Sequence, residues 1–197
     1  MKNILFALIL AVFFVGVSLV IRIFFADVSF ARGYANKNRE VDLSVLLDFR
    51  EAIRLNPLEP AYHRELATAL TAETIEVLSA QEMPETASRA AELAYLAREE
   101  AAAAYRLNPY NSLTLKSIFR TYSSLARYFP SFGELAEAVG RQLLFLAPTE
   151  PRSYYSLANY YAREGNEEEA VKLVKMALAL KPDFNEAESL RKILEKD

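Results

Sequence analysis

The sequence predicts an all-α protein in which helical hairpins follow one long apolar helix. Three observations support this fold class. Apolar and polar residues do not alternate in the way that half-buried strands require. Residues 4–26 are apolar apart from Ser18 and Arg22. A run of Ala, Leu and Arg also leads into a proline four times, at Pro57, Pro109, Pro148 and Pro182.

Residues 4–26 are long enough to cross a membrane. At about 1.5 Å per residue, a helix of this length spans a hydrocarbon core of about 30 Å with some tilt. A cleaved secretory signal is the alternative, but its apolar core normally has about 7–15 residues. We therefore expect residues 1–26 to form a retained transmembrane anchor rather than a signal.

The sequence beside this segment favours two opposite orientations in the membrane. Arg22 and Arg32 lie at or after the span and only Lys2 precedes it, a count that favours a cytoplasmic C-terminal side. The short N-terminal tail instead resembles an uncleaved signal that exports the rest of the chain. We expect a single-pass membrane protein whose soluble domain lies outside the cytoplasm.

The four prolines mark an internal repeat. Their intervals are 52, 39 and 34 residues. The last unit has small, aliphatic or aromatic residues at the regular positions Tyr154, Leu157, Ala158, Tyr161, Ala170, Val174 and Ala177. This pattern resembles the tetratricopeptide repeat (TPR) family, whose period is 34 residues. The resemblance implies a TPR-like helical-hairpin solenoid, in which small residues let paired helices approach and each proline ends a unit.

The prolines also predict the domain division. The transmembrane segment 1–26 precedes four TPR-like helical hairpins, at 27–57, 58–109, 110–148 and 149–182. A C-terminal capping helix follows at 183–197. The second unit has about 18 extra residues relative to a 34-residue repeat, so we expect two lengthened helices. The third has Phe119 where the family has glycine, and Ser131 with Glu134 predicts a capping box. An ordinary helical bundle is the alternative.

Residues that carry chemistry are scarce. The chain has no cysteine, and its five glycines form no phosphate-binding motif. The only histidine, His63, has no Cys and no second His beside it, so we expect a structural or surface role. The net charge of −3 argues against nucleic-acid binding. We expect no catalysis, no cofactor and no metal site.

Polar side chains at helical spacing predict a binding surface. The first helix of each TPR pair usually lines a concave groove, and spacings of three and four residues place side chains on one helical face. The residues expected there are Arg64, Lys116, Arg120, Arg152, Tyr155, Asn159 and Arg163. Guanidinium groups favour a carboxylate or phosphate, so an acidic peptide or a partner's C-terminal carboxylate is the expected ligand, with an anionic glycan as the alternative. Ordinary solvated charges remain the other interpretation.

A second resemblance concerns the order of the segments. The chain has an apolar helix, then "ADVSFARGYA", then "EAIRLNPLEPAYHRELA". This order resembles the TPR-bearing C-terminal tail of O-antigen ligase/polymerase-like membrane proteins. No catalytic position of that family has a match here. The sequence thus predicts a membrane-anchored scaffold that binds a protein partner. The alternative is an accessory or C-terminal fragment of a cell-envelope polysaccharide system.

Overall fold

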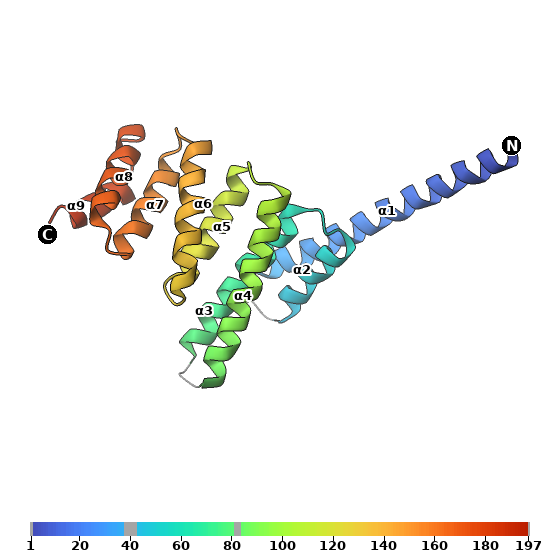
Figure 1. Ribbon diagram of the computed structural model, residues 1–197, viewed down its shortest axis with the longest axis horizontal. Helices are drawn as coiled ribbons and strands as arrows, with labels where there is room; N and C mark the ends of the chain where they lie inside the picture. Colours follow the sequence, from blue (N-terminus) through green and yellow to red (C-terminus); the bar gives the residue numbers. More distant parts are fainter. Residues whose placement is uncertain (1, 38–42, 81–83, 197) are drawn as a thin grey trace. The chain divides into compact units, whose positions relative to one another are not determined.

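The computed structural model of the protein describes residues 2–37, 43–80 and 84–196. These residues form helices and turns without any strand, which confirms the predicted all-α fold class (Figure 1). The α-helices are α1 Lys2–Asn36, α2 Leu43–Leu55, α3 Pro60–Ser79, α4 Pro84–Leu107, α5 Ser112–Leu125, α6 Gly133–Leu146, α7 Pro151–Arg163, α8 Glu167–Leu180 and α9 Asn185–Leu194.

The chain divides into two compact units, residues 1–107 and 108–197, which meet at the second "RLNP". In unit 1, α1 packs with α2, α2 with α3, and α3 with α4. In unit 2, α5 packs with α6, α6 with α7, α7 with α8, and α8 with α9. Within each unit, a helix therefore packs mainly on its neighbours in sequence, as in a solenoid.

Helix α1 is continuous but has an exposed N-terminal part and a partly buried C-terminal part. Large apolar side chains from Ile4 to Phe25 are exposed, whereas Ala26, Ser29 and Gly33 are buried against the rest of unit 1. Gly33 packs closely against α2, because a Cβ atom at Gly33 would lie only 3.0 Å from the ring of Phe49 on α2. Within the described residues, α1 is the one helix long and apolar enough to cross a membrane.

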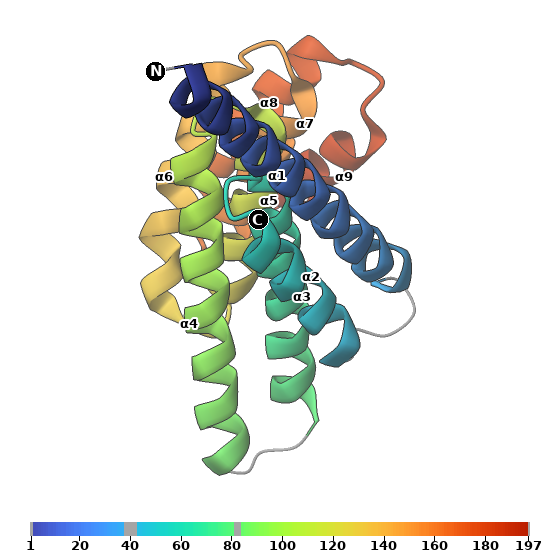
Figure 2. The same cartoon turned by 90° about the vertical axis from the view of Figure 1, so that its right-hand side faces the viewer.

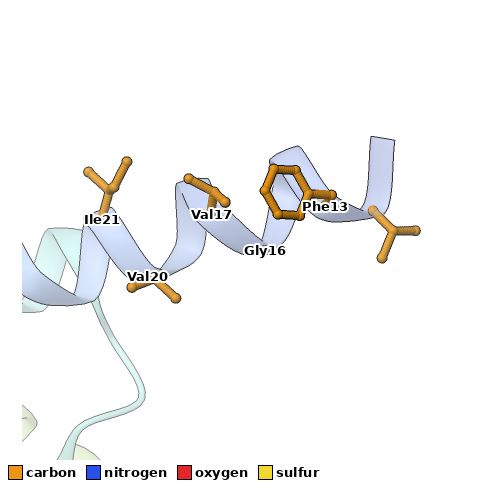
Figure 3. Close-up of a pocket in the computed structure, with 6 residues that line it drawn as sticks. Phe13, Gly16, Val17, Val20 and Ile21 are labelled. Atoms are coloured by element: carbon orange, nitrogen blue, oxygen red, sulfur yellow. The ribbon is translucent and has the colours of Figure 1, made fainter. Parts of the chain in front are cut away.

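The apolar part of α1 has only a shallow hollow at Gly16. The hollow is lined by α1 residues alone, and Figure 3 shows Phe13, Val17, Val20 and Ile21 projecting outward around Gly16. A hollow formed by one exposed helix encloses nothing, so it is not a ligand pocket.

The second hairpin is the longest one. Helices α3 and α4 have 20 and 24 residues, compared with 13 and 14 in α7 and α8. Figures 1 and 2 show α3 and α4 side by side along their length. The extra residues therefore extend both helices, as the sequence predicts.

The last hairpin has the expected buried residues. Ala158, Ala170 and Ala177 are fully buried, and Tyr154 and Leu157 fill the space between helices. The turn uses Gly165, whose φ of 77° lies in the left-handed region that favours glycine. The next residue, Asn166, caps α8 by accepting a hydrogen bond from the backbone of Glu169.

The third hairpin departs from the prediction at the start of α6. The expected capping box is wrong: Ser131 lies in a short 3-10 helix, Pro130–Phe132, and the residue before α6 is Phe132, which makes no side-chain cap. The reason is steric, because Phe132 is buried against the ring of Tyr122 and its backbone continues in a helical conformation.

Candidate functional site

Two contacts join the first helices of the third and fourth hairpins, α5 and α7. Lys116 on α5 forms an ion pair with Glu150, the residue before α7. Near the other end, the Arg163 guanidinium on α7 donates a hydrogen bond of 3.4 Å to the carbonyl of Ser123. These partners place Lys116 and Arg163 at the junction of α5 and α7. We call the predicted polar side chains of α5 and α7 the row: Lys116, Arg120, Arg152, Tyr155, Asn159 and Arg163.

The row continues from α7 to the C-terminal helix α9. The Tyr155 ring lies 5.1 Å from that of Phe184, which precedes α9, and Asn159 donates to the Tyr155 hydroxyl at 3.4 Å. The Arg152 guanidinium lies 5.9 Å from the Phe184 ring and 3.9 Å from Glu186. The predicted polar side chains of α7 therefore contact α5 and the start of α9, and their place on the concave face of the solenoid stays a prediction.

Acidic side chains neutralise part of this row. Glu150 faces Lys116, and Glu186 lies beside Arg152. Partial burial raises the pKa of Glu150, but hydrogen bonds from Lys116 and Ser153 outweigh burial and hold the pKa below its usual range. Glu150 therefore stays ionised, and the Lys116 end of the row is occupied by an internal pair.

The other end of the row has positive charge that forms no ion pair with the described residues of unit 2, although Glu164 lies near enough to Arg163 to offset part of its charge. In the described part of unit 2, no carboxylate lies within 4 Å of Arg120, Arg127 or Arg163. Arg120 and Arg127 are seven residues apart on α5 and the turn after it, and Ser123 lies between them on the same face. We call Arg120, Arg127 and Arg163 the arginine cluster.

The cluster is electrostatically unfavourable by itself. Partial removal from water lowers the pKa of Arg163, and the positive charge of Arg127 lowers the pKa further, by more than the negative charge of Glu164 raises it. Arg163 nevertheless stays protonated, because an arginine guanidinium titrates far above neutral pH. An anion between these side chains would relieve their repulsion. Arg127 was absent from the predicted surface, although its spacing of seven from Arg120 is a signal that could have identified it.

The remaining predicted residue, Arg64, lies on α3 in unit 1. Its side chain is only 16% exposed and lies 3.4 Å from Glu65, which also pairs with Lys37 at 2.7 Å. Arg64 therefore belongs to a local charge network of unit 1. Its membership of one surface with the residues of unit 2 stays a prediction.

Solved structures share this architecture. A thermophilic TPR protein of Thermus thermophilus matches with a TM-score of 0.67 and 18% identity, over 86% of this chain and 81% of that protein. The pilF protein of Pseudomonas aeruginosa matches with a TM-score of 0.63 and 17% identity, over 88% and 68%. MamA from Desulfovibrio magneticus RS-1 matches with a TM-score of 0.61 and 17% identity, over 86% and 83%. No family model and no curated protein matches the sequence.

The chain has the tetratricopeptide-repeat fold. In this TPR fold, the prolines that end the hairpins have a second role besides stopping helices. The carbonyl of Pro57 faces His63 at 3.0 Å, and that of Pro148 accepts from the Tyr154 hydroxyl at 3.0 Å, six residues later in both cases. The carbonyl of Pro109 accepts instead from Gln142 on α6. The connections at these three prolines are thereby each held by a side chain.

His63 is a structural residue of the second TPR hairpin. One ring nitrogen faces the Pro57 carbonyl and the other lies 2.6 Å from the Glu100 carboxylate on α4. Burial alone lowers the pKa of His63, but these two acceptors favour the imidazolium more and raise the pKa above its ordinary value. The ring thus joins the start of α3 to α4.

Metal binding has no support from the part of the chain that the structure describes. Nowhere in residues 2–37, 43–80 and 84–196 do three His, Asp or Glu side chains gather as a metal site. The candidate functional site is therefore the row on α5 and α7, with the arginine cluster at one end.

Proposed function

We propose that this protein is a membrane-anchored scaffold that binds an acidic segment of a protein partner at the arginine cluster of unit 2. The observation that carries the proposal is the group of three guanidiniums without a carboxylate partner in the described part of that unit. A TPR fold supports a binding role, because its stacked hairpins expose an extended inner surface.

The geometry favours an acidic ligand at one end of the row. Lys116 and Arg152 already have acidic neighbours, so a ligand carboxylate would have to displace an internal partner there. At the arginine cluster, a carboxylate would accept charge-assisted hydrogen bonds without displacing any carboxylate of the described part of unit 2. Tyr155 and Asn159, on the same face of α7, supply an aromatic surface and an amide for the adjoining part of the peptide.

Helix α1 supports the membrane half of the proposal. Its apolar side chains from Ile4 to Phe25 are exposed in unit 1, and such a surface is costly to leave in water. A retained anchor would hold the scaffold at a membrane. The extracytoplasmic side and the link to a polysaccharide system both remain predictions.

Site-specific crosslinking in cells tests this function. A photoreactive amino acid at Ser124, which lies on the same face of α5 as the arginine cluster, should crosslink a partner through an acidic segment identified by mass spectrometry. Met176, an exposed residue of the outer helix α8, is the matched control position. Equal crosslinking at both positions, or crosslinking of Ser124 only to non-acidic segments, would contradict the proposal.

A further inference from the structure

The turn between α2 and α3, residues 55–59, is attached to the membrane end of α1. Residues 4–21 contain no charged side chain and measure about 27 Å as a helix, close to the thickness of a hydrocarbon core. Arg22 is the next residue, and Ala26 is already fully buried in unit 1. The first hairpin therefore begins about one helical turn after the apolar span, with no linker between them.

A direct contact sets the position of the turn. The Arg22 guanidinium donates a hydrogen bond of 3.1 Å to the carbonyl of Leu55, the last residue of α2. An arginine that borders a span places its charged head at the level of the lipid headgroups. The end of α2 thus lies within one side chain's length of that level, and Figure 1 shows the turn beside α1.

The polar groups of the turn are used inside unit 1. The Leu55 carbonyl accepts from Arg22, the Pro57 carbonyl faces His63, and the backbone N–H of Leu58 donates to the Asn56 side chain. A second link lies just behind the turn, where the Tyr62 hydroxyl donates to Asp27 on α1. These bonds fix the backbone of the turn against α1.

The side chain of Leu58 points outward from this fixed turn. It is 74% exposed, and it follows shortly after Leu55, which binds Arg22 at the charged end of the apolar span. Water is an unfavourable surrounding for such a side chain, whereas the boundary of a bilayer is not. The Arg22–Leu55 hydrogen bond therefore holds the outward Leu58 close to the end of the apolar surface of α1.

We infer that this turn lies in the headgroup layer of the membrane that α1 crosses, with Leu58 inserted among the lipids. The inference rests on the proposed membrane anchor and adds a second contact between unit 1 and the lipid surface. With two contacts and no linker, the first hairpin would be held at a fixed height on the membrane.

Fluorescence of single-cysteine variants tests the inference, because the natural chain has no cysteine. Full-length Val15→Cys, Leu58→Cys and Ser79→Cys are labelled with an environment-sensitive fluorophore and placed in phosphatidylcholine–phosphatidylglycerol vesicles. Val15 reports the span. Ser79, exposed at the other end of α3 and about 28 Å along the helix from Pro60, is the matched control. Quenching by aqueous iodide and by a headgroup spin-labelled lipid is then compared.

The expected result is that the spin-labelled lipid quenches the Leu58 label several-fold more than the Ser79 label, while iodide reaches Ser79 and not Val15. If Val15 is protected but Leu58 is as accessible to iodide as Ser79, the turn lies in water and the inference is wrong, although the anchor stands. Protection of Leu58 from both quenchers would show that protein covers it and would also overturn the inference. If iodide reaches Val15, the anchor itself fails.

Discussion

Adding one methyl group at Gly140 tests how the third hairpin accommodates Phe119. This aromatic residue occupies a position where TPR proteins have glycine, and Gly140 on α6 supplies the missing space. A Cβ atom at Gly140 would lie 2.7 Å from Cδ1 of Leu157 and 2.9 Å from Cε2 of Phe119. Both distances are well below the optimum of about 3.5–4.0 Å for carbon atoms.

Two effects of opposite sign decide the outcome of Gly140→Ala. Alanine is favoured over glycine inside a helix by about 1 kcal/mol. Overpacking a buried contact costs about 1–3 kcal/mol. Phe119 and Leu157 are both buried, so neither side chain has free space to move into. We therefore expect a net loss of up to about 2 kcal/mol in the free energy of unfolding.

Urea unfolding of the full-length protein in detergent micelles, followed by circular dichroism, measures this change. The double variant Gly140→Ala with Phe119→Leu supplies the control, since removing the ring should relieve the two contacts with Phe119 and leave only the one with Leu157. We expect a coupling free energy of about 0.5–3 kcal/mol between the two positions. A stabilising Gly140→Ala in the natural background, or additive effects, would refute the steric explanation.

Three further predictions test the described packing. Ala158→Leu should lower the free energy of unfolding by about 1–3 kcal/mol by overpacking the last hairpin, whereas Glu168→Ala on its surface should change it by less than about 0.5 kcal/mol, and equal urea midpoints would reject the assignment. Tyr160→Phe removes a hydrogen bond to a backbone carbonyl and should cost about 0.5–1.5 kcal/mol, more than Tyr161→Phe, whose hydroxyl is buried without a hydrogen-bond partner in the described structure. Because folding raises the pKa of His63, its stabilising effect should be complete below about pH 6.5 and decline as the pH rises through the folded value, so His63→Gln should remove this decline in urea titrations between neutral and alkaline pH.

Local periodicity predicts most of the fold. The proline intervals and the small residues Ala158 and Ala170 identify the last hairpin, because helix pairing depends on residues three and four apart. Gly140 could not be connected to Phe119 in the same way. Their contact depends on how α5 and α6 cross, and the spacing along one helix does not contain that information.

In the candidate site too, spacing along one helix was predictable from the sequence, and contacts between helices were not. Helical spacing places Arg120 and Arg163 on the first helices, and the structure joins α5 to α7 through the Arg163–Ser123 bond. The pairing of Lys116 with Glu150 was beyond sequence reasoning, because the two residues are 34 positions apart and meet only when successive hairpins stack. That pairing decides which charges of the row remain open to a ligand.

The measurement that tests the central claim most directly is the affinity of the full-length protein for an acidic peptide with a free C-terminal carboxylate. Fluorescence anisotropy in neutral detergent micelles compares the natural protein with Arg120→Ala, Arg163→Ala, their combination, and Lys172→Ala on the outer helix α8. The account predicts that the double variant binds at least about tenfold more weakly, a change of about 1.4 kcal/mol, and that salt weakens binding to the natural protein. Lys172→Ala should bind like the natural protein. Indistinguishable affinities for the natural protein and the double variant would contradict the account.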